Sequence, residues 1–150
     1  MFPDLSKFSE PEKLRKLLFN ARRLGHHDYA FQIQMRIAEL AGLPFSDALE
    51  REFWTAVSYV EEVKTEATGK TTRLSGTRTK HKKYGTIRCL GDWAMDPNPS
   101  EGLGSLVEHK RAELSGEAIV LRHADKFPAE AVASAAAKLA ALGVSREQVV

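Results

Sequence analysis

Cysteine is nearly absent from this chain of 150 residues, in which Cys89 is the only one. A single cysteine excludes an internal disulfide framework and a zinc site with four cysteine ligands. Apolar runs are short, so no segment is expected to span a membrane. Residues 1–10 mix apolar and charged side chains and lack the apolar core of a signal peptide. We therefore expect a cytoplasmic protein.

The sequence patterns of common enzymes and cofactor sites are also missing. It has no glycine-rich phosphate loop, no Gly-x-Ser-x-Gly and no His-Glu-x-x-His. His26 and His27 are adjacent and point in different directions on a helix, and His123 and Asp125 have similarly poor ligand spacing. We therefore predict no catalytic residue, no metal site and no cofactor, and a protein that is not an enzyme.

Three helices are predicted in the first half of the chain. Ser9 is the expected N-cap of the first helix, and Gly25 ends it. The second helix covers about Asp28–Ala41. The third has Ser46 as its expected cap and extends to about residue 67. Its apolar stripe consists of Leu49, Phe53, Ala56, Val57, Val60 and Val63.

A short stretch of the first two helices resembles a tetratricopeptide-type helical hairpin. The residues that match its hinge and second helix are Ala21-Arg22-Arg23-Leu24-Gly25, Ala30, Ala38, Leu40 and Pro44. The pattern occurs once, whereas a solenoid needs about three repeats. The resemblance therefore implies two antiparallel packed helices and no repeat array.

The second half of the chain also favours helices. A polar loop enters a helix between Ser75 and Lys80, and the turn at Asp96–Pro99 interrupts the helical pattern. Short helices follow over residues 100–143. In the last of them, the residues expected to face inward are Val132, Ala133, Ala136, Leu139 and Ala140.

The whole pattern predicts an all-α fold: one domain over residues 1–150, built as a compact bundle of six or seven helices. Its parts are the helical hairpin with the long third helix (9–67), a basic loop-plus-helix (64–95) and the C-terminal helices (100–143). Within it, Cys89 is expected to be a small buried residue and Trp93 to anchor the basic part to the core, with an exposed stacking ring as the alternative for Trp93.

Positive charge is concentrated in residues 64–88, which we call the basic segment. It holds eight Lys or Arg residues and a single acid, Glu66, although the whole chain has a net charge of only +2. Such a segment on an otherwise acidic body favours a polyanionic partner. Threonine and serine hydroxyls lie between the charges and suit a phosphate backbone.

These features predict a small nucleic-acid-binding protein and favour duplex DNA over RNA. The expected contacts are to phosphates, because the basic segment contains no Asn or Gln that would read adenine. The predicted binding residues are Lys70, Arg73, Arg78, Lys80, His81, Lys82, Lys83, Tyr84 and Arg88.

Other interpretations stay open at this point. The basic segment could pair with the acidic body of the same chain, or bind an acidic protein. A helical adaptor would use a groove between the first three helices, near Phe31, Trp54 and Tyr59. The apolar stripe of the third helix could be the seam of a homodimer.

A metal-dependent nuclease is a third, minor hypothesis. It would use Glu62 and Glu66, which share a helical face at i, i+4. These residues belong to a set of glutamates opposite the apolar stripe, which is expected to be a solvated face. The set consists of Glu50, Glu52, Glu61, Glu62 and Glu66.

Overall fold

The computed structural model describes residues 2–150 and shows an all-helical protein, as the sequence predicts. Over this range it contains no β-strand, and none of its helices is long and apolar enough to cross a membrane. The α-helices are α1 (Pro11–Arg23), α2 (His27–Gly42), α3 (Ala48–Thr68), α4 (Ser75–Tyr84), α5 (Thr86–Met95), α6 (Leu103–Glu108), α7 (Gly116–Arg122) and α8 (Ala129–Ala140). Short 3-10 turns, η1 (Leu5–Lys7), η2 (Ala112–Leu114), η3 (Ala124–Lys126) and η4 (Arg146–Gln148), occur between and beside them.

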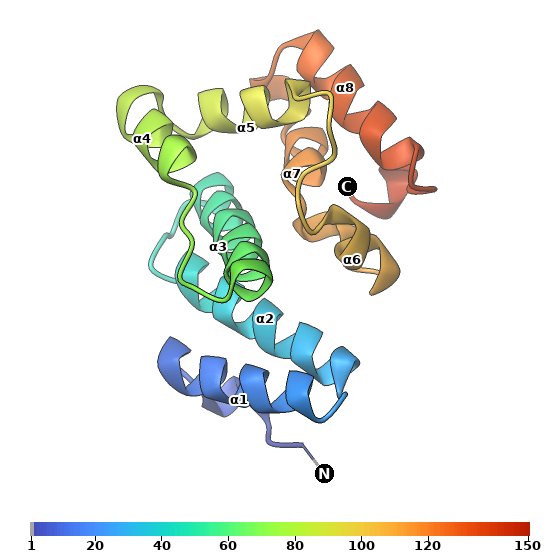
Figure 1. The fold of residues 1–150 in the computed structure, drawn as a ribbon. Coiled ribbons are helices and arrows are strands. Elements are labelled where there is room, and N and C mark those ends of the chain that lie inside the picture. Colours follow the sequence, from blue (N-terminus) through green and yellow to red (C-terminus); the bar gives the residue numbers. More distant parts are fainter. Residues whose placement is uncertain (1) are drawn as a thin grey trace.

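Helix α2 is packed on two sides, between α1 and α3 (Figure 1). Ile33 and Ile37 pack against α1, whereas Phe31, Met35 and Ala38 belong to a cluster shared with α3 and α6. The chain reverses direction between α1 and α2 at Gly25, whose φ is +80°. The antiparallel pair implied by the hairpin resemblance is therefore present.

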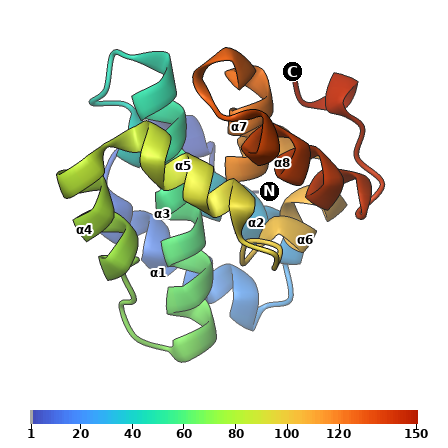
Figure 2. The same cartoon turned by 90° about the horizontal axis from the view of Figure 1, so that it is seen from above.

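The main hydrophobic core lies between the first half of α3 and the helices α5, α7 and α8 (Figure 2). The apolar stripe of α3 faces this core and the α2 cluster, and Phe53 and Val57 are fully buried. The stripe is thus used inside the chain instead of at a dimer seam. Cys89 is buried in the core as predicted.

Two predicted helix caps are wrong. Glu10, not Ser9, is the N-cap of α1 and makes no side-chain capping bond; Pro11 occupies the first position of the helix, where its missing N–H leaves no donor unpaired. Asp47, not Ser46, caps α3 and accepts from the Glu50 N–H. Serine and aspartate are about equally good caps, so sequence alone does not choose between neighbours.

Two predictions in the second half also need correction. In α8 the buried side chains are Ala131, Ala135 and Leu139, whereas Ala133 and Ala140 are exposed. The inward face is thus rotated from the predicted one, because an alanine-rich helix has little contrast between its faces. Helical spacing also continues across Gly85 in the sequence, but the structure breaks there into α4 and α5.

The glutamates of α3 do not form a solvated face. Glu61 and Glu62 are only 5% and 7% exposed. Each of the five glutamates instead has an arginine or histidine partner on another element. The pairs are Glu50–His81, Glu52–Arg122 and His123, Glu61–Arg78, Glu62–Arg15 and Glu66–Arg22. The face opposite the apolar stripe therefore joins α3 to α1, α4 and the end of α7.

Candidate nucleic-acid interface

The basic segment forms the end of α3, a loop over residues 69–74, all of α4 and the start of α5. Glycine ends both helices: Gly69 after α3 has φ +76° and Gly85 after α4 has φ +89°, conformations that favour a residue without a Cβ. α4 lies at one edge of the molecule (Figure 1) and contains no buried residue. Its side chains therefore divide into an inner set held by the body and an outer set in solvent.

Arg78 lies on the inner side of α4 and is bound by Glu61. Its Nε and Nη2 donate to the two oxygens of the carboxylate at 2.7 and 2.8 Å. The same carboxylate accepts from the Leu74 N–H at 2.8 Å, just before the first residue of α4. Burial acts to raise the pKa of Glu61, but these hydrogen bonds and the charges of Arg78 and Arg73 outweigh it and lower the pKa. Glu61 therefore fixes the N-terminal end of α4.

His81 also points inward. Its ring stacks on Phe53, with centroids 5.1 Å apart, and meets the edge of Trp54 at 4.7 Å. Its Nε2 lies 3.0 Å from the Thr86 hydroxyl and 3.4 Å from Glu50. His81 therefore lies on the inner side of α4. The sequence predicts a phosphate contact for this residue, but its side chain is not part of the outer surface.

Asp92 of α5 holds two further cations of the basic segment. Lys80 Nζ donates to its Oδ2 at 2.8 Å and Arg88 Nε donates to the same oxygen at 3.1 Å. These hydrogen bonds, that of Lys80 foremost, lower the pKa of Asp92. The side chains of Lys80 and Asp92 are each 40% exposed, and that of Arg88 is 57% exposed. This pairing lies at the surface, unlike that of Glu61.

The outer side of α4 is open to solvent. Ser75, Thr79 and Lys82 recur at i, i+4 and i+7 and share one face, with Lys83 next to them. Lys82, Lys83 and the loop residue Lys70 are exposed and form no ion pair within residues 2–150.

Tyr84 extends this surface at the end of α4, with half of its area exposed. Lys83 Nζ and the Arg88 guanidinium lie 5.2 and 4.9 Å from the centre of its ring. The outer surface therefore combines hydroxyls, free ammonium groups and an aromatic ring.

The structure thus brings only some of the predicted binding residues together. Lys70, Lys82, Lys83 and Tyr84 are exposed at the surface; Arg73 is mostly exposed and 3.9 Å from Glu61; Lys80 and Arg88 are paired with Asp92; and Arg78 and His81 are turned inward. Neither Asp92 nor Glu61 is predicted from the sequence as a partner of the basic segment. The i, i+4 spacing of Arg88 and Asp92 is a signal that could have identified the first.

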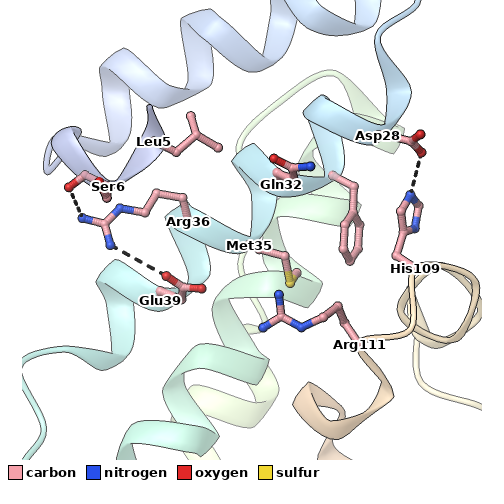
Figure 3. Close-up of a pocket in the computed structure, with 10 residues that line it drawn as sticks. Leu5, Ser6, Asp28, Gln32, Met35, Arg36, Glu39, His109 and Arg111 are labelled. Carbon is pink, nitrogen blue, oxygen red and sulfur yellow. Dashed lines mark hydrogen bonds and ion pairs between the residues drawn. The ribbon is translucent and has the colours of Figure 1, made fainter. Parts of the chain in front are cut away.

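A separate cavity of about 700 Å³ lies away from α4, along α2 between η1 and the turn after α6 (Figure 3). Phe31 forms part of its wall and stacks on His109, with ring centroids 3.9 Å apart. His109 Nε2 is 3.4 Å from Asp28 at one end, and Arg111 points into the cavity near Met35. Tyr59, expected near the edge of an adaptor groove, is instead buried, with its hydroxyl donating to the Gly102 carbonyl.

The acids proposed for a nuclease are engaged by arginines. Glu62 accepts from Arg15 and Glu66 accepts from Arg22. Over residues 2–150, three or more His, Cys, Asp or Glu side chains do not gather anywhere in a way that could hold a metal ion. Within the described residues, Glu62 and Glu66 therefore lie in ion pairs with arginines of α1.

Comparison with family models, with curated proteins and with solved structures finds no match to this chain.

Proposed function

We propose that this protein binds duplex DNA through the outer face of α4. The observation that carries the proposal is the pair Lys82 and Lys83, which form no ion pair within residues 2–150 and share the outer side of α4 with the hydroxyls of Ser75 and Thr79. Ammonium groups and hydroxyls are the side chains that contact phosphates in such complexes. Lys70 adds a third free cation on the adjacent loop.

The dimensions of α4 suit this role. An α-helix with its side chains is about 10–12 Å across, which matches the major groove of B-DNA, about 12 Å wide. None of the residues of α4 is fully buried, and its outer face can approach a groove while Arg78 and His81 keep their contacts with the body. Tyr84 and the shared cations beside it would lie next to the phosphate rows.

Salt dependence provides a quantitative test. The three lysines that form no ion pair within residues 2–150 would alone contribute about −2.7 to the slope of log affinity against log salt, since each phosphate contact contributes about −0.9. The measurement is fluorescence anisotropy with a labelled duplex of about 25 base pairs at several salt concentrations, starting near 50 mM.

The variant that tests the face is Lys82→Glu with Lys83→Glu. Affinity should fall about tenfold or more, with thermal stability near that of the wild type. The matched control is Lys7→Glu with Lys16→Glu, which makes the same charge change at exposed positions on η1 and α1. Equal losses in the two double variants, or no binding by the wild type at low salt, would contradict the proposal.

A protein-binding adaptor is the second candidate, and the cavity along α2 is the observation that favours it. Phe31 lines the cavity, as the adaptor hypothesis expects of its groove, and the cavity lies away from the basic segment. Its other lining residues come from η1, α2 and the turn after α6, whereas the hypothesis places the groove between the first three helices. A partner that enters it would be excluded by Gln32→Trp, because Gln32 is exposed and lines the cavity. If the Gln32→Trp variant still binds a protein that the wild type binds, the cavity is not the binding site of that protein.

A further inference from the structure

Helix α4 is attached to the body by polar contacts that differ in burial. The carboxylate of Glu61 is 6% exposed and holds Arg78, whereas Asp92 is 40% exposed and holds Lys80 and Arg88. A buried, doubly hydrogen-bonded pair resists a competing anion, because separating it leaves a charge without a partner in the interior. An ion pair at the surface contributes little to stability, so a competing anion readily replaces one of its partners.

The partners of Asp92 are the groups that a phosphate would use. One oxygen of Asp92 accepts from an ammonium at 2.8 Å and from a guanidinium at 3.1 Å. Charge-assisted bonds of both kinds are formed with phosphate oxygens as well as with carboxylates. Arg88 also lies 4.9 Å from the ring of Tyr84. The Asp92 pairs are therefore directly beside the outer surface of α4.

We propose that Asp92 is a built-in competitor for phosphate, which occupies Lys80 and Arg88 in the free protein and is replaced by a DNA phosphate on binding. This inference rests on the proposed DNA-binding function and deepens it. It separates the predicted binding residues into two groups: Lys80 and Arg88 join the contact, whereas Arg78 stays on Glu61 and keeps α4 in place. Binding is thereby weakened by the energy needed to release the two cations from Asp92.

The first test is the affinity of Asp92→Asn for the labelled duplex. Removing the competitor should raise affinity about three- to tenfold, the range expected for one or two surface ion pairs. Glu130→Gln is the matched control, because Glu130 is exposed on neighbouring α8, forms no ion pair within residues 2–150 and lines the same surface groove as Arg88 and Asp92. Its gain should be clearly smaller. Equal gains in the two variants would overturn the inference.

The second test is the salt slope of Lys80→Met with Arg88→Met. If phosphates replace Asp92, the wild type uses these two cations, and the variant loses about 1.8 from the magnitude of its slope. An unchanged slope would show that Asp92 keeps both cations in the complex. The gain of Asp92→Asn should also disappear when it is added to this double variant.

The outcomes separate the two proposals. Binding by the wild type with no effect at Asp92 rejects the competitor and keeps the DNA-binding function. Binding by Asp92→Asn but not by the wild type supports a strong competitor. No binding by either protein at low salt rejects the DNA-binding function and the inference with it. Circular dichroism of each variant confirms that the helical fold is intact.

Discussion

Lys138 of α8 lies 3.0 Å from Glu117 of α7 inside the C-terminal part of the core. Glu117 is fully buried, and the side chain of Lys138 is 9% exposed. Lys138 Nζ donates to the Trp93 carbonyl at 2.9 Å, and the Ser100 hydroxyl donates to the other carboxylate oxygen of Glu117 at 3.0 Å. These polar contacts connect α5, α7, α8 and the turn before α6 in an otherwise apolar region.

Removing one member of this pair should destabilise the protein strongly. We expect Lys138→Met to lower the free energy of unfolding by about 3–5 kcal/mol, because Glu117 is left buried without its ion-pair partner. The double variant Lys138→Met with Glu117→Leu should recover at least half of the loss. Urea denaturation measures both, and a double variant no more stable than the single one would contradict this account.

Gly116 and Trp93 should be energetically coupled. A Cβ at Gly116 would lie 2.9 Å from two ring carbons of Trp93, closer than real contacts allow. Gly116→Ala should therefore cost about 1–3 kcal/mol. In a Trp93→Phe background the cost of Gly116→Ala should be smaller, because the smaller ring leaves room for the added Cβ. The change of Trp93 to Phe itself breaks no hydrogen bond, since Trp93 Nε1 has no hydrogen-bond partner within residues 2–150. Additive effects in thermal unfolding would rule out the contact.

Truncation of the ring, Trp93→Ala, should lower the free energy of unfolding by about 2–4 kcal/mol.

Glu61 should make stability depend on acid pH. Its pKa is lower in the folded protein than the ordinary value of 4.5, so its contribution is present above that value and is lost as pH falls through the lowered one. Glu61→Gln should cost about 1–3 kcal/mol at neutral pH and show a flatter loss of stability below pH 4.5. Glu130→Gln, which removes an exposed carboxyl on α8, is the control for the loss of one acidic side chain in the same denaturation series.

Cys89 should react slowly with thiol reagents. Burial raises the pKa of its thiol, and the side chain is 4% exposed in the core. Only the thiolate is a good nucleophile, so both effects lower its rate. Dithionitrobenzoate should label the native protein slowly and the urea-unfolded protein at once. Equal rates in the two states would show that the thiol is accessible.

The helices and their order can be predicted from the sequence because their signals are local. Gly25 ends α1, and Pro97 with Pro99 separates α5 from α6. The break at Gly85 is missed, since a single glycine is tolerated within a helical pattern. The register of α8 is missed because alanine is small enough for either face. These errors occur where the local signal is weak.

From the sequence, the candidate site can be predicted only as a segment rich in positive charge. Its division into inner and outer residues depends on partners that are distant in sequence. Arg78 is turned inward by Glu61, 17 residues earlier, and His81 by Glu50, 31 residues earlier. Hydropathy assigns Glu61 to a solvated face, since no pattern shows which arginine will neutralise it. Long-range pairing is therefore the information that the structure adds.

The absence of buried residues from α4 has a consequence for how such a protein can change over time. Substitutions on a core helix must keep volume and polarity, because cavities and buried charges are costly. On the outer face of α4 these constraints do not apply, so Ser75, Thr79, Lys82 and Lys83 can be exchanged while Glu61 and Arg78 hold the helix in position. The same scaffold can therefore acquire new contacts by single substitutions, without refolding its interior.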